Sequence, residues 1–87
     1  MNPEKSISPT IKALVDRWPS AIVARSEVRT FSGGVISPGY IANLDSAGVG
    51  PPGAFRIGSK VCYPAERLAE WIENRAQPIE RKTRGDK

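Results

Sequence analysis

Hydrogen-bonding side chains recur at helical spacing in the middle of this chain. Asn43 lies three positions after Tyr40 and four after Gly39, a spacing that places it near both residues on one side of an α-helix. A phenol and a carboxamide both donate and accept hydrogen bonds, and a glycine lets another molecule approach the backbone closely. These residue types predict a surface that reads the polar groups of a partner. The alternative is a short core helix with a weak first turn.

Groups that could support catalysis are scarce. The 87 residues include no histidine and one cysteine, Cys62, which therefore has no partner for an internal disulfide or for a papain-like nucleophile–base pair. Glu66, Glu70 and Glu73 recur at helical spacing, and we interpret them as the solvated face of a helix. No phosphate-binding glycine loop or cluster of metal ligands is evident. We expect no enzymatic activity, no cofactor and no bound metal.

The helix that must carry the polar face has marked ends. Ser37 is suited to cap its first free amides, and Pro38 occupies a position where a missing N–H costs nothing. Gly48 can adopt the left-handed conformation that closes a helix. Ile41 and Leu44 are expected to face the core. The sequence therefore predicts a short helix between Ser37 and Gly48.

A second short helix is expected just before it. Ser26 would open this helix, which would run from residue 27 to residue 31 or 32. Arg25 and Arg29 would remain outside, exposed to solvent. Glycines at positions 33 and 34 break the pattern, so two short helices are joined by a glycine-bearing turn. This is the order of a helix-turn-helix.

A β-hairpin is expected over residues 55–63, around Gly58-Ser59, a pair suited to a type II′ turn. A two-residue turn would put the apolar residues of the two strands on opposite faces, and exposing two of them would forfeit ~1.5–3 kcal/mol each. We therefore expect a three-residue loop or a bulge at Lys60. Four apolar residues would then share one face: Phe55, Ile57, Val61 and Tyr63. Arg56, Lys60 and Cys62 would lie on the outer face.

Three other elements complete an expected mainly helical domain. An amphipathic helix should begin at Ser8 and end at Trp18; we interpret it as a packing helix, and the alternative is a DNA-contacting arm. Residues 21–24 are expected to form an edge strand. The last helix should start with Pro64 and carry an apolar stripe. The stripe consists of Ala65, Leu68, Trp71 and Ile72.

The net charge of +4 is unevenly distributed. Basic residues outnumber acidic ones in residues 21–63 and again in 77–87, whereas residues 64–76 are net acidic, so the positive field should lie on one side. We expect an N-terminal extension (1–20), one domain (21–76) and a disordered tail (77–87) that is either solubilising or a basic arm. Because no apolar run could span a bilayer and residues 1–5 lack a signal-peptide segment, a cytoplasmic location is expected.

Short motifs follow one another in a distinctive order between residues 21 and 75. They are Thr30-Phe31-Ser32-Gly33-Gly34, Ile36-Ser37, Ile41-Ala42-Asn43-Leu44-Asp45-Ser46, Gly48-Val49-Gly50-Pro51-Pro52, Arg56-Ile57-Gly58-Ser59-Lys60-Val61, and Tyr63-Pro64 with Leu68 and Trp71. This set resembles phage or prophage excisionases and AlpA-type regulators. Those are small winged-helix proteins that are distantly similar to the MerR DNA-binding domain.

The resemblance implies a winged helix-turn-helix that binds duplex DNA, with the Ser37 helix in the major groove and the hairpin as a wing on phosphates. Such a protein would either direct an integrase toward excision or switch a promoter. The residues expected at DNA are Arg25, Arg29, Ser37, Gly39, Tyr40, Asn43, Arg56, Ser59 and Lys60. Ser59 stands where the family commonly has a basic residue.

The expected partners are double-stranded DNA and, alongside it, an integrase or recombinase, with no membrane. We expect a monomer in solution that is able to bind DNA cooperatively. The alternative is a protein-interaction module, in which the Tyr40 face and the tail bind an integrase or repressor. In that case DNA would not compete with the protein partner.

Overall fold

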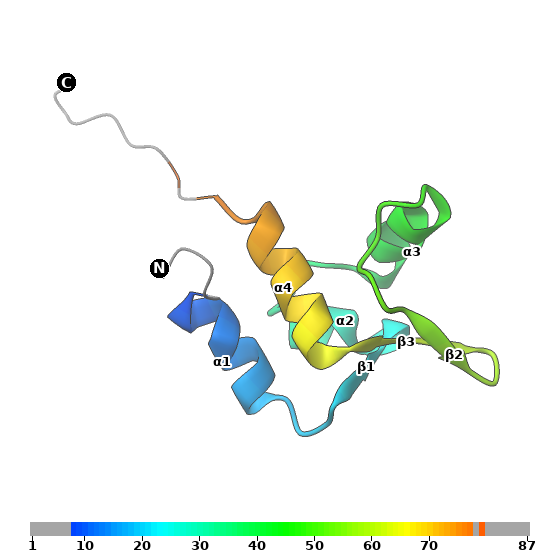
Figure 1. Ribbon diagram of the computed structural model, residues 1–87, viewed down its shortest axis with the longest axis horizontal. Coiled ribbons are helices and arrows are strands. Elements are labelled where there is room, and N and C mark those ends of the chain that lie inside the picture. Colours follow the sequence, from blue (N-terminus) through cyan, green and yellow to red (C-terminus); the bar gives the residue numbers. More distant parts are fainter. Residues whose placement is uncertain (1–7, 78, 80–87) are drawn as a thin grey trace, which may run out of the picture.

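The computed structural model describes residues 8–77 and 79, and this part contains four α-helices, a 3₁₀ turn and a three-stranded antiparallel sheet (Figure 1). The elements in chain order are α1 (Pro9–Arg17), β1 (Ile22–Ala24), η2 (Arg25–Glu27), α2 (Val28–Phe31), α3 (Pro38–Ser46), β2 (Phe55–Ile57), β3 (Lys60–Pro64) and α4 (Ala65–Arg75). The fold is mixed α/β, with the expected helices and hairpin. Most of the predicted tail, 77–87, lies outside the described residues.

The N-terminal helix α1 packs against α4, as predicted for a packing helix. Its cap forms as expected, since the Ser8 hydroxyl accepts a hydrogen bond from the Ile11 N–H at 3.3 Å. Trp18 follows its last turn and donates from Nε1 to the Ile22 carbonyl at 2.8 Å. The Trp18 ring meets Phe31 edge-on, with centroids 5.4 Å apart. These contacts join α1 to the core of the domain.

Strand β3 is central in the sheet, with β1 on one side and β2 on the other. The register with β1 places Val23 opposite Tyr63, and both side chains are fully buried. They pack into a single apolar core with residues from α2, α3 and α4. Its buried members are Val23, Val28, Phe31, Ile36, Ile41, Tyr63, Ala65, Leu68, Ala69 and Trp71. The edge strand predicted at 21–24 is confirmed as β1.

The prediction of an extra residue in the hairpin is wrong. Arg56 pairs with Val61 and Ile57 with Lys60 across a plain two-residue turn, in which Gly58 has φ 62°, as a type II′ turn requires. Cys62 consequently turns inward and is 3% exposed, whereas Ile57 is 56% exposed. The burial argument failed because the hairpin projects away from the helices (Figure 1). Strand β2 has no core to bury its apolar side chains in, so turn chemistry sets the register.

Two helix starts also differ from the expectation. Ser26 lies inside η2, whose N-cap is Ala24, so Ser26 does not open the helix. Pro64 is the residue before α4 rather than its first residue. Each difference moves a boundary by one or two residues and leaves the expected helix in place.

The turn between α2 and α3 is held by a buried serine. The Ser32 hydroxyl accepts a hydrogen bond from the Ile36 N–H at 2.9 Å and donates to the Arg29 carbonyl at 3.3 Å. Gly33 and Gly34 lie between these groups with φ of 71° and 92°, a region that glycine adopts without steric cost. The glycine-bearing turn predicted from the sequence is therefore a closed, hydrogen-bonded loop.

Candidate nucleic-acid interface

The polar face predicted on the Ser37 helix is confirmed on α3. The Ser37 hydroxyl caps the helix by accepting a hydrogen bond from the Tyr40 N–H at 3.1 Å. Ile41 is fully buried and Tyr40 is 42% exposed, while Gly39 and Asn43 are also exposed. A Cβ built on Gly39 would meet nothing within 4 Å. Packing within the protein therefore does not require glycine at this position, whereas close approach by another molecule would.

The C-terminal end of α3 closes as the sequence predicted. Gly48 has φ 80° and donates to the Asp45 carbonyl at 3.0 Å, and Val49 donates to the Leu44 carbonyl at 2.9 Å. This pair of bonds is the Schellman arrangement. Both ends of α3 are thus defined, and its length is set by the sequence around Ser37 and Gly48.

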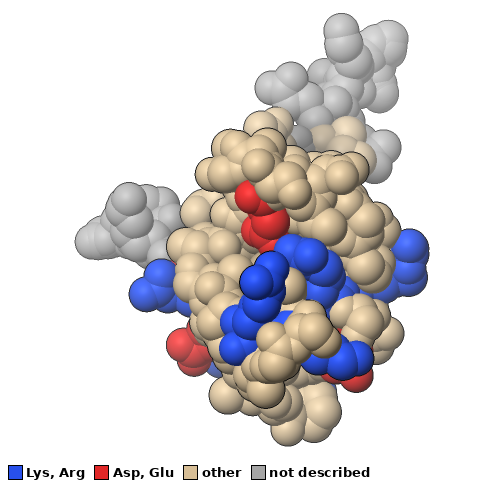
Figure 2. All heavy atoms as spheres, turned by 90° about the vertical axis from the view of Figure 1, so that its right-hand side faces the viewer, with Lys and Arg blue, Asp and Glu red and all other residues tan. Residues whose placement is uncertain are grey.

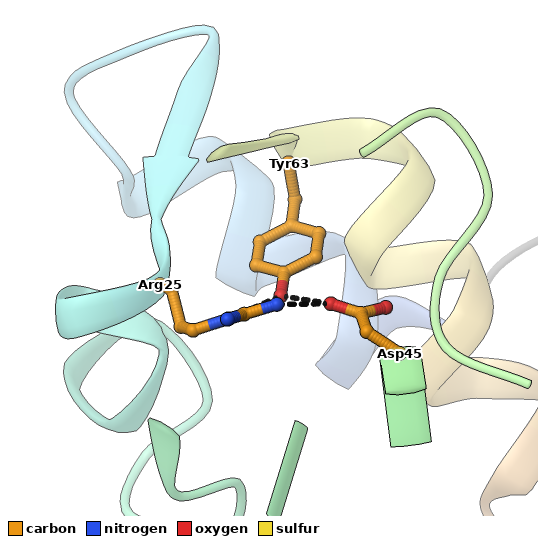
Figure 3. A network of polar contacts seen from close by, with 3 residues as sticks. All are labelled: Arg25, Asp45 and Tyr63. Carbon is orange, nitrogen blue, oxygen red and sulfur yellow. Dashed lines mark hydrogen bonds and ion pairs between the residues drawn. The ribbon is translucent and has the colours of Figure 1, made fainter. Parts of the chain in front are cut away.

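A polar network joins the last turn of α3 to η2 and β3 (Figure 3). The Asp45 Oδ2 atom accepts hydrogen bonds from the Tyr63 hydroxyl and from Arg25 Nη2, each at 2.6 Å. Arg25 Nε also donates to the Tyr63 hydroxyl at 3.0 Å. Arg25 begins η2, Asp45 is in the last turn of α3 and Tyr63 is in β3. The expectation that Arg25 is left outside is met only in part, because its side chain is 29% exposed while its guanidinium is held by these two partners.

Burial of Tyr63 and its hydrogen bond to Asp45 raise the pKa of Tyr63 to about 12. The hydrogen bond with Tyr63, assisted by Asp45, raises the pKa of Arg25. The network therefore favours a neutral phenol next to an ion pair. A neutral Tyr63 keeps its proton available for Asp45.

We expect Tyr63 to ionise at pH about 12 in the folded protein and at about 10 in the unfolded chain. Since the folded state binds the proton more tightly, the stability contributed by this group is complete below pH ~10 and is lost as the pH rises to about 12. Tyrosinate absorbance in a Tyr40→Phe variant reports Tyr63 alone, because the chain has two tyrosines. A native midpoint near 10 would contradict the network.

The hairpin presents its predicted polar residues in a different arrangement from the one expected. Arg56, Ser59 and Lys60 are all exposed. However, Arg56 pairs with Val61 and Lys60 with Ile57, and neighbouring pairs in a ladder point to opposite faces. The expectation that Arg56 and Lys60 share one face is therefore wrong. They lie on the two sides of the hairpin and near its tip.

A cleft links the hairpin tip to the start of α3. Its lining includes Arg25, Pro38, Ser59 and Lys60, so it brings together residues from η2, α3 and the hairpin. Arg29 is exposed on α2 and does not line this cleft. Figure 2 shows the side of the molecule that carries α3 and the hairpin, with Lys and Arg side chains gathered across its middle.

Sequence reasoning missed a further basic residue beside α3. Arg75 of α4 donates to the Tyr40 hydroxyl at 2.9 Å, and its guanidinium lies over the Trp71 ring, 4.7 Å from the centroid. The cation therefore sits on an aromatic support next to the first turn of α3. The signal that could have found it is the four-residue spacing of Trp71 and Arg75, which stacks the two side chains on one helix face.

The described residues contain no group of three or more histidine, cysteine, aspartate or glutamate residues placed to hold a metal ion. Within residues 8–77, no helix has the length and apolar character needed to cross a bilayer. Comparisons with protein-family models, with curated proteins and with solved structures find no match for this chain.

Proposed function

We propose that this protein is a winged helix-turn-helix that binds duplex DNA sequence-specifically and has no catalytic activity. In this proposal α2 and α3 form the helix-turn-helix, α3 enters the major groove, and the β2–β3 hairpin is a wing on the phosphates. The DNA-bound protein would act as an excisionase beside an integrase or as a prophage transcriptional regulator. Both roles depend on the same DNA-binding step.

The observation that carries the proposal is the shared side of α3 and the hairpin. An exposed helix face with Gly39, Tyr40 and Asn43 lies on the same side as a hairpin whose tip exposes Arg56 and Lys60. Basic side chains gather on this side (Figure 2). An asparagine can donate to and accept from an adenine edge in the major groove, whereas charges on flexible side chains suit phosphates.

Substitutions on α3 and on the hairpin should therefore change DNA binding in different ways. Asn43→Ala should weaken binding by about 1–3 kcal/mol on a duplex selected by the wild-type protein, and should have little effect on mixed-sequence DNA. Arg56→Ala and Lys60→Ala should weaken binding to both kinds of DNA. Each should also lower the salt slope, the dependence of log affinity on log salt concentration, by about one unit. Titrations on both duplexes at several salt concentrations measure these quantities.

Lys12→Ala provides the matched control, because it removes the same charge from α1, on the opposite side of the fold from the hairpin (Figure 1). It should leave the affinity for both duplexes and the salt slope unchanged. If Asn43→Ala behaves like the hairpin variants, α3 contacts only the phosphate backbone of DNA and does not read bases. If no variant differs from the control, DNA binding through this side is wrong. A protein partner that DNA does not displace would favour the interaction-module alternative.

A further inference from the structure

The Arg25–Asp45–Tyr63 network contains one residue from each part of the proposed DNA-binding surface. Arg25 leads into the first helix of the helix-turn-helix, Asp45 belongs to α3, and Tyr63 belongs to the inner strand of the hairpin. All three hydrogen bonds between them are 3.0 Å or shorter. The three parts are thus connected at one point, in addition to their apolar packing.

Apolar packing alone holds α3 weakly. Ile41 is the only residue of α3 that is buried, and Leu44 is partly buried against the core. A nine-residue helix that rests on so few buried side chains has little apolar packing to define its orientation. Directional hydrogen bonds at Asp45, in the last turn of α3, would fix the angle of this helix relative to the hairpin.

The carboxylate in that contact has little room to move. Oδ2 of Asp45 accepts both hydrogen bonds. On the other side, a Cβ at Gly50 would lie 1.9 Å from Oδ1, so the backbone of the following loop closes over the second oxygen. Tyr63 is fully buried, so its ring is fixed by the core. The side chain of Asp45 is therefore held from two directions.

We propose that Arg25, Asp45 and Tyr63 are positioning residues, which set the angle of α3 relative to the hairpin and thereby the sequence selectivity of DNA binding. This inference rests on the proposed function. It also gives Arg25, whose side chain is 29% exposed, a role toward Asp45 and Tyr63 in place of the expected role as a phosphate contact. Base reading needs side chains held to within about half an ångström, whereas phosphate contacts carry no direct sequence information.

Two variants test this role. Tyr63→Phe removes one hydroxyl without changing the charge or the packed ring. Asp45→Asn removes the charge that Arg25 and Tyr63 share, and Asp16→Asn is its matched control, since Asp16 forms an exposed ion pair with Lys12 on α1. The two Asn variants raise the net charge equally, so any general electrostatic gain in DNA affinity is the same in both.

The measurement is affinity for a duplex enriched from a random pool by the wild-type protein and for a mixed-sequence duplex, at several salt concentrations and with folding verified by circular dichroism. We expect Tyr63→Phe, and Asp45→Asn relative to Asp16→Asn, to lose ~10-fold in affinity for the enriched duplex. Affinity for mixed-sequence DNA and the salt slope should not change. A purely structural role would leave the ratio of the two affinities unchanged in folded protein.

Other outcomes overturn the inference. Equal losses on both duplexes with a smaller salt slope would make Arg25 a phosphate contact that the network merely orients. Variants that keep the wild-type selectivity while the wild-type protein enriches a sequence would refute the positioning role and leave the proposed function standing. A wild-type protein that enriches no sequence and binds no duplex would refute both.

Discussion

Replacing Trp71 with alanine should lower the free energy of unfolding by about 3–5 kcal/mol. Trp71 is 8% exposed within the core, its Nε1 donates to the Val49 carbonyl at 3.3 Å, and its ring supports Arg75. The substitution removes packing and also the contact that attaches the loop after α3 to α4. The loss is a large part of the ~5–15 kcal/mol typical of a whole domain.

Chemical denaturation measures this loss, and Trp18 remains as a fluorescent reporter because the chain has two tryptophans. Trp71→Phe is the matched control. It keeps an aromatic ring in the core and loses only the indole N–H and part of the volume, so its effect should be clearly smaller. An alanine variant that loses less than about 1 kcal/mol would show that α4 does not close the core through this residue.

The second large effect is expected at Gly50, where alanine should destabilise the protein by about 1–3 kcal/mol. The new Cβ would lie 1.9 Å from Asp45 Oδ1 and 3.2 Å from Asp45 Cα. The carboxylate could yield only by leaving Arg25 and Tyr63, and the Cα belongs to the backbone of α3. The loop after α3 must therefore shift, or the network must break.

Two further variants isolate the cause. Gly39→Ala is the matched glycine substitution, with open space around its Cβ, and it should stabilise α3 by up to ~1 kcal/mol. In an Asp45→Ala background the penalty of Gly50→Ala should shrink, because the contacts with the carboxylate are gone. A full penalty in that background would trace the effect to the loop itself and not to Asp45.

Local chemistry explains why much of the fold was predictable. Ser8 and Ser37 cap α1 and α3, and Gly48 ends α3, through contacts with residues only a few positions away. The apolar stripes of the helices likewise follow helical periodicity. These features depend on short segments, so the sequence alone was enough to find them.

The hairpin register and the network were beyond such reasoning, because each depends on where distant segments meet. The register prediction assumed that β2 would be buried, and β2 lies outside the core. Arg25 and Tyr63 are 38 positions apart, and nothing near Arg25 indicates a partner in β3. For the same reason the contact of Arg75 with Tyr40 was missed. The exposed face of α3, in contrast, depends on local spacing and could be found from the sequence.

The pairing of β1 with β3 has a consequence for synthesis on the ribosome. Strand β3 is central but is translated long after β1, and Val23 gains its partner only when Tyr63 has emerged. A nascent chain that ends within the loop before β2 already contains the residues of α1, α2 and α3 but cannot complete the sheet. The domain should therefore acquire its cooperative stability in one step, only when β3 and α4 have left the exit tunnel.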